Sequence, residues 1–275
     1  MTATTYDLPA APRQQGRVAL LWMSVFTAAW TVVLYWQPAI QASGVPTAAS
    51  RIFVHALIAL GLWLGLERTE MIAAQRRNAW LAVMVPFTLW VSVVWSAAIN
   101  GLFKPGAIGL PLTPMAIFLP VIIGAPIVLR SKRLGQVLDA MPATWLVALQ
   151  CYRVFGALFL ANWARGAMPG IFALPAGAGD VVTGLFALPA AIALASGSAS
   201  GRRAAVMWNI FGLVDFAVAV SIGIITSPGP LQLIVPSVPN GTGLYPTVLV
   251  PTLAVPSSIL LHVVSLRQLW RRAKA

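Results

Sequence analysis

Two oppositely charged residues, Arg153 and Asp215, lie near the middle of long apolar segments, where an ionisable side chain is costly. An unpaired arginine at the centre of a membrane helix costs at least ~2.5–3.5 kcal/mol on insertion scales. A helix rises ~1.5 Å per residue, which places both side chains close to the midplane of a bilayer. Asp215 is the only carboxylate that this interpretation puts at that depth. We therefore expect Arg153 and Asp215 to pair, directly or through water.

Two roles for this pair stay open. It could be a static strut between two helices, or a switch coupled to a proton or a substrate, because breaking a buried pair leaves an uncompensated charge. Gln150 lies one turn before Arg153 and is expected to extend the same polar face. These three residues are therefore candidates for binding a substrate or for coupling its movement.

Asn209 and His262 are expected at a similar depth, in the third of the membrane nearest the cytoplasm. Side chains of these types hydrogen-bond across neighbouring membrane helices. Histidine titrates near neutral pH, so His262 could carry a proton. The alternative is a packing residue with its ring nitrogens satisfied.

Asp180 follows the run Pro175-Ala176-Gly177-Ala178-Gly179 and is expected to open a helix. An aspartate at this position accepts backbone hydrogen bonds and complements the positive end of the helix. The alternative is a site carboxylate on the floor of an outer vestibule, where the glycine-rich turn admits a ligand. Arg165 is then the expected counter-ion.

Cofactor and metal chemistry has little support, and the sequence predicts neither a cofactor nor a metal site. His55 and His262 are the two histidines of the chain, and their expected depths differ by roughly 18 Å, too far to clamp one haem iron. The sequence contains no HExxH zinc motif and no GxSxG nucleophile elbow. It also lacks the GxxxxGK[ST] phosphate loop, so ATP hydrolysis by this chain is not expected.

Long apolar segments position these candidate residues. The chain has 275 residues, of which 59% are hydrophobic and 9% are charged, whereas about a quarter of the residues of a soluble domain are charged. A helix that crosses the hydrocarbon core needs about 20 apolar residues. Eight such segments are expected, at residues 18–36, 51–66, 80–99, 110–129, 143–162, 180–197, 204–225 and 246–266. The predicted fold is an all-α integral membrane protein, a polytopic bundle of about eight transmembrane helices.

The basic residues indicate the orientation of this bundle. Fourteen of the eighteen lie on one side of the alternating pattern, in residues 13–17, 68–77, 130–133, 202–203 and 267–274. Short loops rich in lysine and arginine stay cytoplasmic, so both termini are expected there. The net charge of +12 is spread over helix ends, which fits contact with anionic lipid headgroups better than a nucleic-acid partner.

The expected organisation is a disordered cytoplasmic N-terminus (1–12), a single transmembrane domain (13–270) and a basic cytoplasmic tail (271–275). Three loops on the other side, residues 100–111, 163–179 and 226–246, are rich in glycine and proline and nearly uncharged. They could roof a cavity, or they could lie flat on the helix ends. Prolines in the fourth and eighth segments suggest two four-helix halves in parallel repeat, a pattern that points to a transporter binding site.

These features favour a secondary transporter or a ligand-binding permease, with a site between helices near the midplane and an outer vestibule. The alternatives are an intramembrane enzyme acting on a lipid or isoprenoid, with Asp180 or His262 as acid/base, and a non-catalytic membrane subunit or scaffold. The expected location is a cell membrane, with loops as compact as those of a bacterial inner-membrane protein. The expected partners are membrane lipids and a small-molecule or lipid-like ligand. A homo-oligomer is also possible, because the small residues at 190–195 could pack helices between chains.

Overall fold

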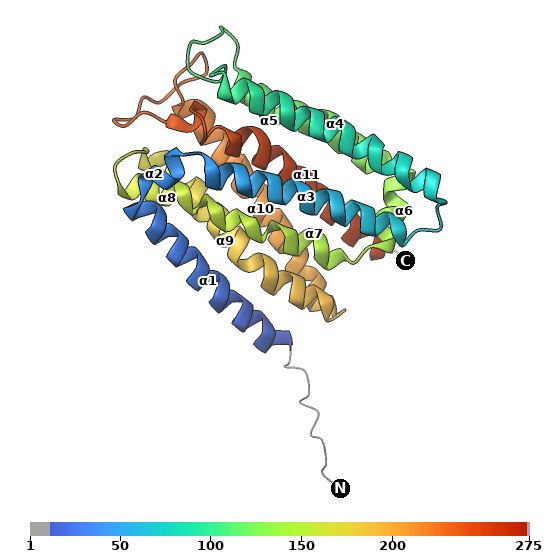
Figure 1. Cartoon of the computed structure of the whole chain (residues 1–275). Coiled ribbons are helices and arrows are strands. Elements are labelled where there is room, and N and C mark those ends of the chain that lie inside the picture. The colour runs from blue at the N-terminus through green and yellow to red at the C-terminus, as the bar shows by residue number, and fades with distance from the viewer. Residues whose placement is uncertain (1–11, 274–275) are drawn as a thin grey trace.

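The computed structural model describes residues 12–273, which form helices and connecting loops and contain no strand (Figure 1). Eight helical stretches in this range are long and apolar enough to cross a membrane, which agrees with the number expected from the sequence. They are Arg13–Trp36, Val45–Glu67, Ala73–Ile99, Leu112–Arg130, Ala143–Ala164, Gly170–Ala195, Ala199–Thr226 and Val250–Arg272. The predictions for the first eleven residues and for the last two residues of the basic tail lie outside the described part.

The bundle has an apolar surface and holds several fully buried polar side chains in its interior. Ile122 is 64% exposed and Leu89 is 63% exposed, whereas Gln150, Asn209 and His262 are fully buried. Water-soluble proteins show the reverse preference, because large apolar side chains are stabilised by removal from water. The eight helices therefore have the surface expected of a membrane bundle.

The outer helices lie along two edges of the bundle. α1 (Pro12–Trp36) forms one edge, and α4 (Ala73–Ile99) and α5 (Leu112–Arg130) lie along the opposite edge (Figure 1). The short helix α2 (Pro38–Ala42) leads from α1 into α3 (Val45–Glu67), which packs on α4. These helices enclose the spans that carry the buried polar residues.

The interior is built around α9 (Gly170–Ala195), which packs against α1 and against α10 (Ala199–Thr226). The eighth span begins with a π-helical turn, η3 (Val250–Ala254), and continues as α11 (Val255–Arg272). α11 packs against both α5 and α10. The fifth and eighth spans are the most buried of the eight, so their side chains mostly face other helices.

The fifth span changes its helix type half-way. It consists of α7 (Ala143–Leu149), the 3₁₀-helix η1 (Gln150–Gly156) and α8 (Ala157–Ala164). A 3₁₀-helix rarely runs beyond four residues, and one in the middle of a helix often marks a hinge or a strained sequence. Residues three apart share one face of such a helix. Gln150 and Arg153 therefore lie on the same side, as predicted.

A short amphipathic helix, α6 (Lys132–Ala140), connects the fourth and fifth spans, where the sequence predicts only a basic loop. The Ser131 hydroxyl caps its start by accepting a hydrogen bond from the backbone N of Leu134 (3.1 Å). Arg271 holds its other end by donating from Nε to Oδ1 of Asp139 (3.0 Å) and from Nη2 to Oδ2 (2.5 Å). The end of the last span is thereby tied to the loop before the fifth.

The Asp139–Arg271 pair predicts a pH dependence at this end of the bundle. The two hydrogen bonds from Arg271 hold the pKa of the Asp139 carboxyl below its usual value. A carboxyl whose pKa is lowered by folding stabilises the protein above its unfolded pKa, and this contribution is lost as the pH falls through the folded pKa. We expect a carbon NMR titration to give Asp139 a pKa below that of an isolated aspartate, and Arg271→Gln to raise it. An unchanged value in Arg271→Gln would contradict this account.

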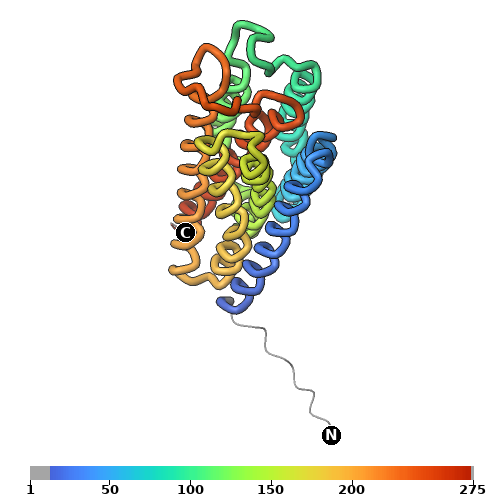
Figure 2. The backbone as a smooth tube through the Cα atoms, turned by 90° about the vertical axis from the view of Figure 1, so that its left-hand side faces the viewer, coloured from blue at the N-terminus to red at the C-terminus, as the bar shows by residue number. Residues whose placement is uncertain are grey.

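Two long loops, residues 100–111 and 227–249, lie together at the end of the bundle away from the basic clusters (Figure 2). We call this the loop end, and the opposite end the arginine end. The second loop contains the 3₁₀ turn η2 (Gly241–Gly243) and is fixed by Asn240, whose Nδ2 donates to Oγ1 of Thr226 (2.8 Å).

The third loop expected from the sequence is mostly helical, which corrects the prediction for residues 163–179. α9 begins at Gly170 and continues without a break through Pro175 and the glycine run. In apolar surroundings the backbone must satisfy its hydrogen bonds internally, so a helix continues through residues that would end it in water. Asp180 therefore lies well inside α9, not at its N-cap.

The parallel repeat of two four-helix halves stays a prediction. The fourth span keeps a continuous α-helix through Pro120 and Pro126, whereas the eighth span places Pro251 in the π-helical turn η3. The prolines of the two halves thus accompany different local structures.

Candidate functional site

Arg153 forms ion pairs with two carboxylates in the middle of the bundle. Its Nε donates to Oδ1 of Asp180 (2.7 Å), and its Nη2 donates to Oδ2 of Asp215. The Arg153 side chain is 1% exposed, so both pairs are shielded from solvent. The predicted pairing of Arg153 with Asp215 is confirmed. The expectation that Asp215 is the only carboxylate at this depth is wrong, because Asp180 is the second partner.

The remaining parts of the guanidinium also have partners. Its Cζ lies 3.8 Å from the centre of the Phe216 ring, a cation–π contact. Nη1 donates to the backbone oxygen of Gly212 (3.4 Å) and lies 3.2 Å from Nε2 of His262. α10 supplies Gly212, Asp215 and Phe216, so one helix provides three of the contacts of Arg153.

The contact with Arg153 fixes the tautomer of His262. A guanidinium only donates hydrogen bonds, so Nε2 of His262 must accept and the ring proton must lie on Nδ1. Nδ1 then donates to Oδ1 of Asn209 (2.9 Å). Asn209 in turn donates from Nδ2 to the backbone oxygen of Ala205 (2.8 Å) and to Oγ of Ser265 (3.1 Å). These bonds are mutually consistent with a neutral imidazole.

The predicted hydrogen bond between Asn209 and His262 is therefore present, but His262 lies nearer the middle of its span than expected. The eighth span extends from Val250 to Arg272, further toward the arginine end than the predicted segment. Its added turn shifts the midpoint, and His262 joins the Arg153 cluster. Within residues 12–273 no three His, Cys, Asp or Glu side chains are grouped so that they could hold a metal ion.

Gln150 contributes to a neighbouring set of contacts. Its Nε2 donates to the backbone oxygen of Ser258 (3.1 Å), and the hydroxyl of Tyr152 forms a hydrogen bond with Oγ of the same serine. Gln150 Oε1 is buried and has no hydrogen-bond partner among the described residues. The 3₁₀-helix η1 is thus joined to α11 on one side and to α9 and α10 through Arg153.

Arg165 does not pair with Asp180, so the prediction that it is the counter-ion of Asp180 is wrong. Arg165 lies just beyond α8, where its guanidinium donates to the backbone oxygen of Leu34 (2.9 Å) and to Oδ1 of Asn162. It therefore fixes the end of the fifth span to α1 at the loop end. Asp180 takes Arg153 as its partner because α9 starts ten residues earlier than predicted.

Three glycines allow the helices around the cluster to approach closely. A Cβ at Gly179 would overlap the carboxylate of Asp215, and one at Gly212 would lie 2.5 Å from Nε2 of His262. A Cβ at Gly184 would lie 2.5 Å from the backbone of η1. The glycine-rich run before Asp180 is therefore a helix-packing surface, not a turn.

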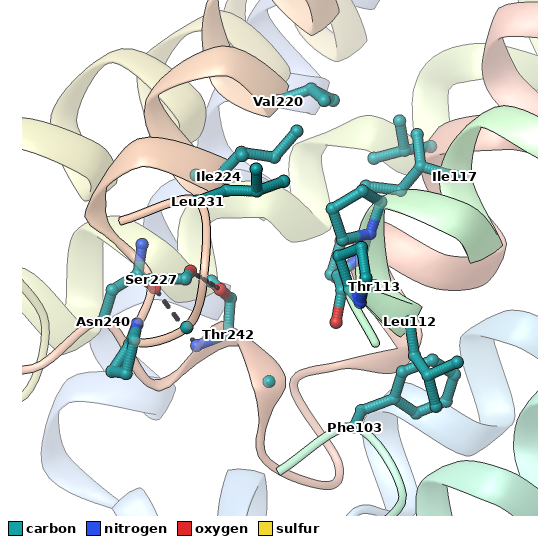
Figure 3. A pocket seen from close by; sticks show the side chains of 18 of the residues that line it. Phe103, Leu112, Thr113, Ile117, Val220, Ile224, Ser227, Leu231, Asn240 and Thr242 are labelled. Carbon is teal, nitrogen blue, oxygen red and sulfur yellow. Dashed lines mark hydrogen bonds between the residues drawn. The ribbon is translucent and has the colours of Figure 1, made fainter. Parts of the chain in front are cut away.

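A cavity of about 140 Å³ extends from the two long loops to the ion-paired cluster. Asp180 and Asp215 line its inner end, and we call it the loop-end cavity. Figure 3 shows Ser227, Asn240 and Thr242 on one side of its outer part, opposite apolar side chains of α5 and the first loop. Two of the three loops, residues 100–111 and 226–246, thus line a cavity, the first of the two alternatives left open by the sequence.

A second, smaller cavity of about 40 Å³ also borders Asp180. It is lined by Arg51, Tyr152 and Gln41, and Arg51 lies 5.3 Å above the ring of Tyr152. Arg51 is the first residue of the expected segment 51–66, but it lies in the second turn of α3, which begins at Val45. Pro46, near the first position of that helix, is the signal that could have placed it correctly.

Comparison of the sequence with known proteins identifies the family of this chain. No curated protein sequence and no solved structure matches the chain. A family model for a domain of unknown function, DUF8737, matches residues 110–270, more than half of the sequence. The chain belongs to the DUF8737 family.

The DUF8737 region begins just before α5 and ends two residues before the end of α11. It contains Arg153, both of its carboxylate partners and His262. Most of the loop-end cavity lies in it as well. The first three spans lie outside it, and with them Arg51. The central cluster is therefore built wholly from the DUF8737 region.

Proposed function

We propose that this chain is a small permease or secondary transporter whose ligand enters at the loop end and binds against Asp180 and Asp215. The observation that carries the proposal is the loop-end cavity, which leads to ion-paired residues in the middle of the bundle. Substrate sites of helical transporters lie near the bilayer midplane. Ionisable residues at that depth commonly mark a pathway for a substrate or an ion.

We also infer that the eight spans are inserted in a cell membrane, with the arginine end in the cytoplasm and the loop end outside. The basic loops support this orientation, because positive residues stay on the cytoplasmic side. The exposed apolar faces would then contact lipid tails. The short connections fit a bacterial inner membrane.

Thiol labelling tests this proposal without knowledge of the ligand. Cys151 is the one cysteine in the chain and is replaced by alanine first. Ala219→Cys then places a thiol in the loop-end cavity, one turn from Asp215. Val218→Cys is the matched control, because this neighbour is 42% exposed on α10 and does not line the cavity. Ala107→Cys, in the first loop, reports the orientation.

A charged, membrane-impermeant methanethiosulfonate is added outside sealed cells. We expect it to modify Ala107→Cys and Ala219→Cys, and to modify Val218→Cys at least about tenfold more slowly, because a thiol facing lipid does not ionise. Equal rates at residues 218 and 219 would contradict a water-filled route to the cluster. Labelling of Ala107→Cys only from the cytoplasmic side would overturn the orientation.

A structural role is the second candidate, and the hydrogen bonding of Arg153 supports it. All three guanidinium nitrogens have partners, as expected of a strut that joins η1 to two other helices. A scaffold of this kind needs the cluster for folding but needs no ligand. It predicts that Ala219→Cys stays unlabelled in a well-folded protein and that a partner protein co-purifies.

A further inference from the structure

The inner end of the loop-end cavity presents negative charge. Asp180 and Asp215 line this cavity, whereas Arg153 does not. Each carboxylate uses one oxygen for Arg153, and the other oxygen has no hydrogen-bond partner among the described residues. A molecule at the inner end of the cavity therefore meets the two aspartates and not the guanidinium.

No positive charge offsets these oxygens from within the cavity's inner part. Lys104 is the one basic residue among those that line the cavity, and it lies exposed on the first loop, at the opposite end. Arg51 balances the total charge of the cluster, but it lines the second cavity, which also borders Arg153, and not the loop-end cavity. The two aspartates at the inner end of the cavity thus each keep one acceptor oxygen without a donor among the described residues.

The wall between the loops and these oxygens is apolar. Ile117, Phe172 and Phe216 line it, with Val220 on α10. A cavity of about 150 Å³ lined by apolar side chains holds one benzene molecule, so a volume of about 140 Å³ suits a single ring. Aromatic rings also attract a cation, and Phe172 is one such ring in the wall, whereas a face of Phe216 already contacts Arg153.

We propose that the ligand of this cavity is a small organic cation, with a primary ammonium group on an apolar body of about one ring. The ammonium supplies three donors to the free oxygens of Asp180 and Asp215, and the ring lies between α5 and α10. The inference rests on the proposed ligand-binding function and names its substrate class.

Three molecules of nearly the same shape test the charge preference: benzylamine, benzyl alcohol and benzoate. Binding of each radiolabelled compound is measured by equilibrium dialysis against protein in nanodiscs. Val220→Trp fills the apolar part of the cavity, so binding that this variant lacks is counted as cavity binding. This subtraction removes partition into lipid, which matters most for benzyl alcohol.

We expect benzylamine to bind the cavity at least about tenfold more tightly than the other two, the lower range for a hydrogen bond to a charged group. Asp215→Asn should weaken benzylamine about tenfold and leave benzyl alcohol within about twofold. Asp139→Asn, the same change outside the cavity, should alter none of the three. The comparison within the unmodified protein stands even if Asp215→Asn fails to fold.

Equal or tighter cavity binding of benzyl alcohol or benzoate would overturn the cation preference, and so would the absence of cavity binding by benzylamine. The proposed ligand-binding function survives both results if Ala219→Cys is labelled from the loop end. That function fails separately, when the thiol in the cavity is unreactive in folded protein.

Discussion

Replacing Arg153 with methionine is expected to destabilise this protein more than any other single change to the central cluster. Methionine keeps most of the side-chain volume but leaves Asp180 and Asp215 facing one another without their shared guanidinium. Removing one partner of a buried ion pair costs ~3–5 kcal/mol, mostly because the remaining charge is uncompensated. Chemical unfolding of the purified protein in mixed micelles measures this loss of free energy.

The cause of that loss can be separated from the loss of packing. If the unpaired carboxylates are responsible, adding Asp180→Asn and Asp215→Asn to Arg153→Met should recover most of the stability, because no buried charge is then left. If the cost comes from lost packing against Phe216, the triple variant should be no more stable than the single one. If the triple variant folds stably but does not bind ligand, the contribution of these residues to stability is separated from their contribution to ligand binding.

The sequence was sufficient to predict the eight spans, because apolar length and the alternation of basic loops are properties of the chain itself. It was also sufficient for two contacts in the interior. Arg153 and Asp215, like Asn209 and His262, are polar residues whose depth can be counted along a helix, and polar groups in lipid must find partners.

The features that the sequence did not predict depend on where helices begin and end, and on how closely neighbouring helices approach one another. Asp180 was assigned to a helix start because glycine and proline usually end helices in water, whereas α9 continues through both. The predicted start of the second span, at Arg51, is too late, because α3 begins at Val45. The contact of Gly179 with Asp215 joins two different helices, α9 and α10, and no periodic pattern in either helix contains it.

That contact gives the second large expected effect. Gly179→Ala adds one methyl group where a Cβ would overlap the carboxylate of Asp215, so either α9 or Asp215 must move. Overpacking of a tight interior costs ~1–3 kcal/mol, and here the displaced group is also a partner of Arg153. Gly61→Ala is the matched control, because a Cβ at this helical glycine meets nothing within 4 Å. Alanine there should stabilise the protein by ~0.5–1 kcal/mol, as in an unobstructed helix.

A double-mutant cycle shows whether Asp215 carries the effect of Gly179→Ala. In an Asp215→Ala background the carboxylate that would be overlapped is gone, so the added methyl group has room. We expect Gly179→Ala to cost little in that background, which gives a coupling free energy of at least ~1 kcal/mol between the two sites. Additive costs would contradict the contact and place the strain elsewhere along α9. Strong coupling would instead show that the close approach of α9 and α10 at Gly179 positions the Asp215 side chain. Because Asp215 is a partner of Arg153 and lines the loop-end cavity, this glycine would then set the geometry of a residue at the candidate site.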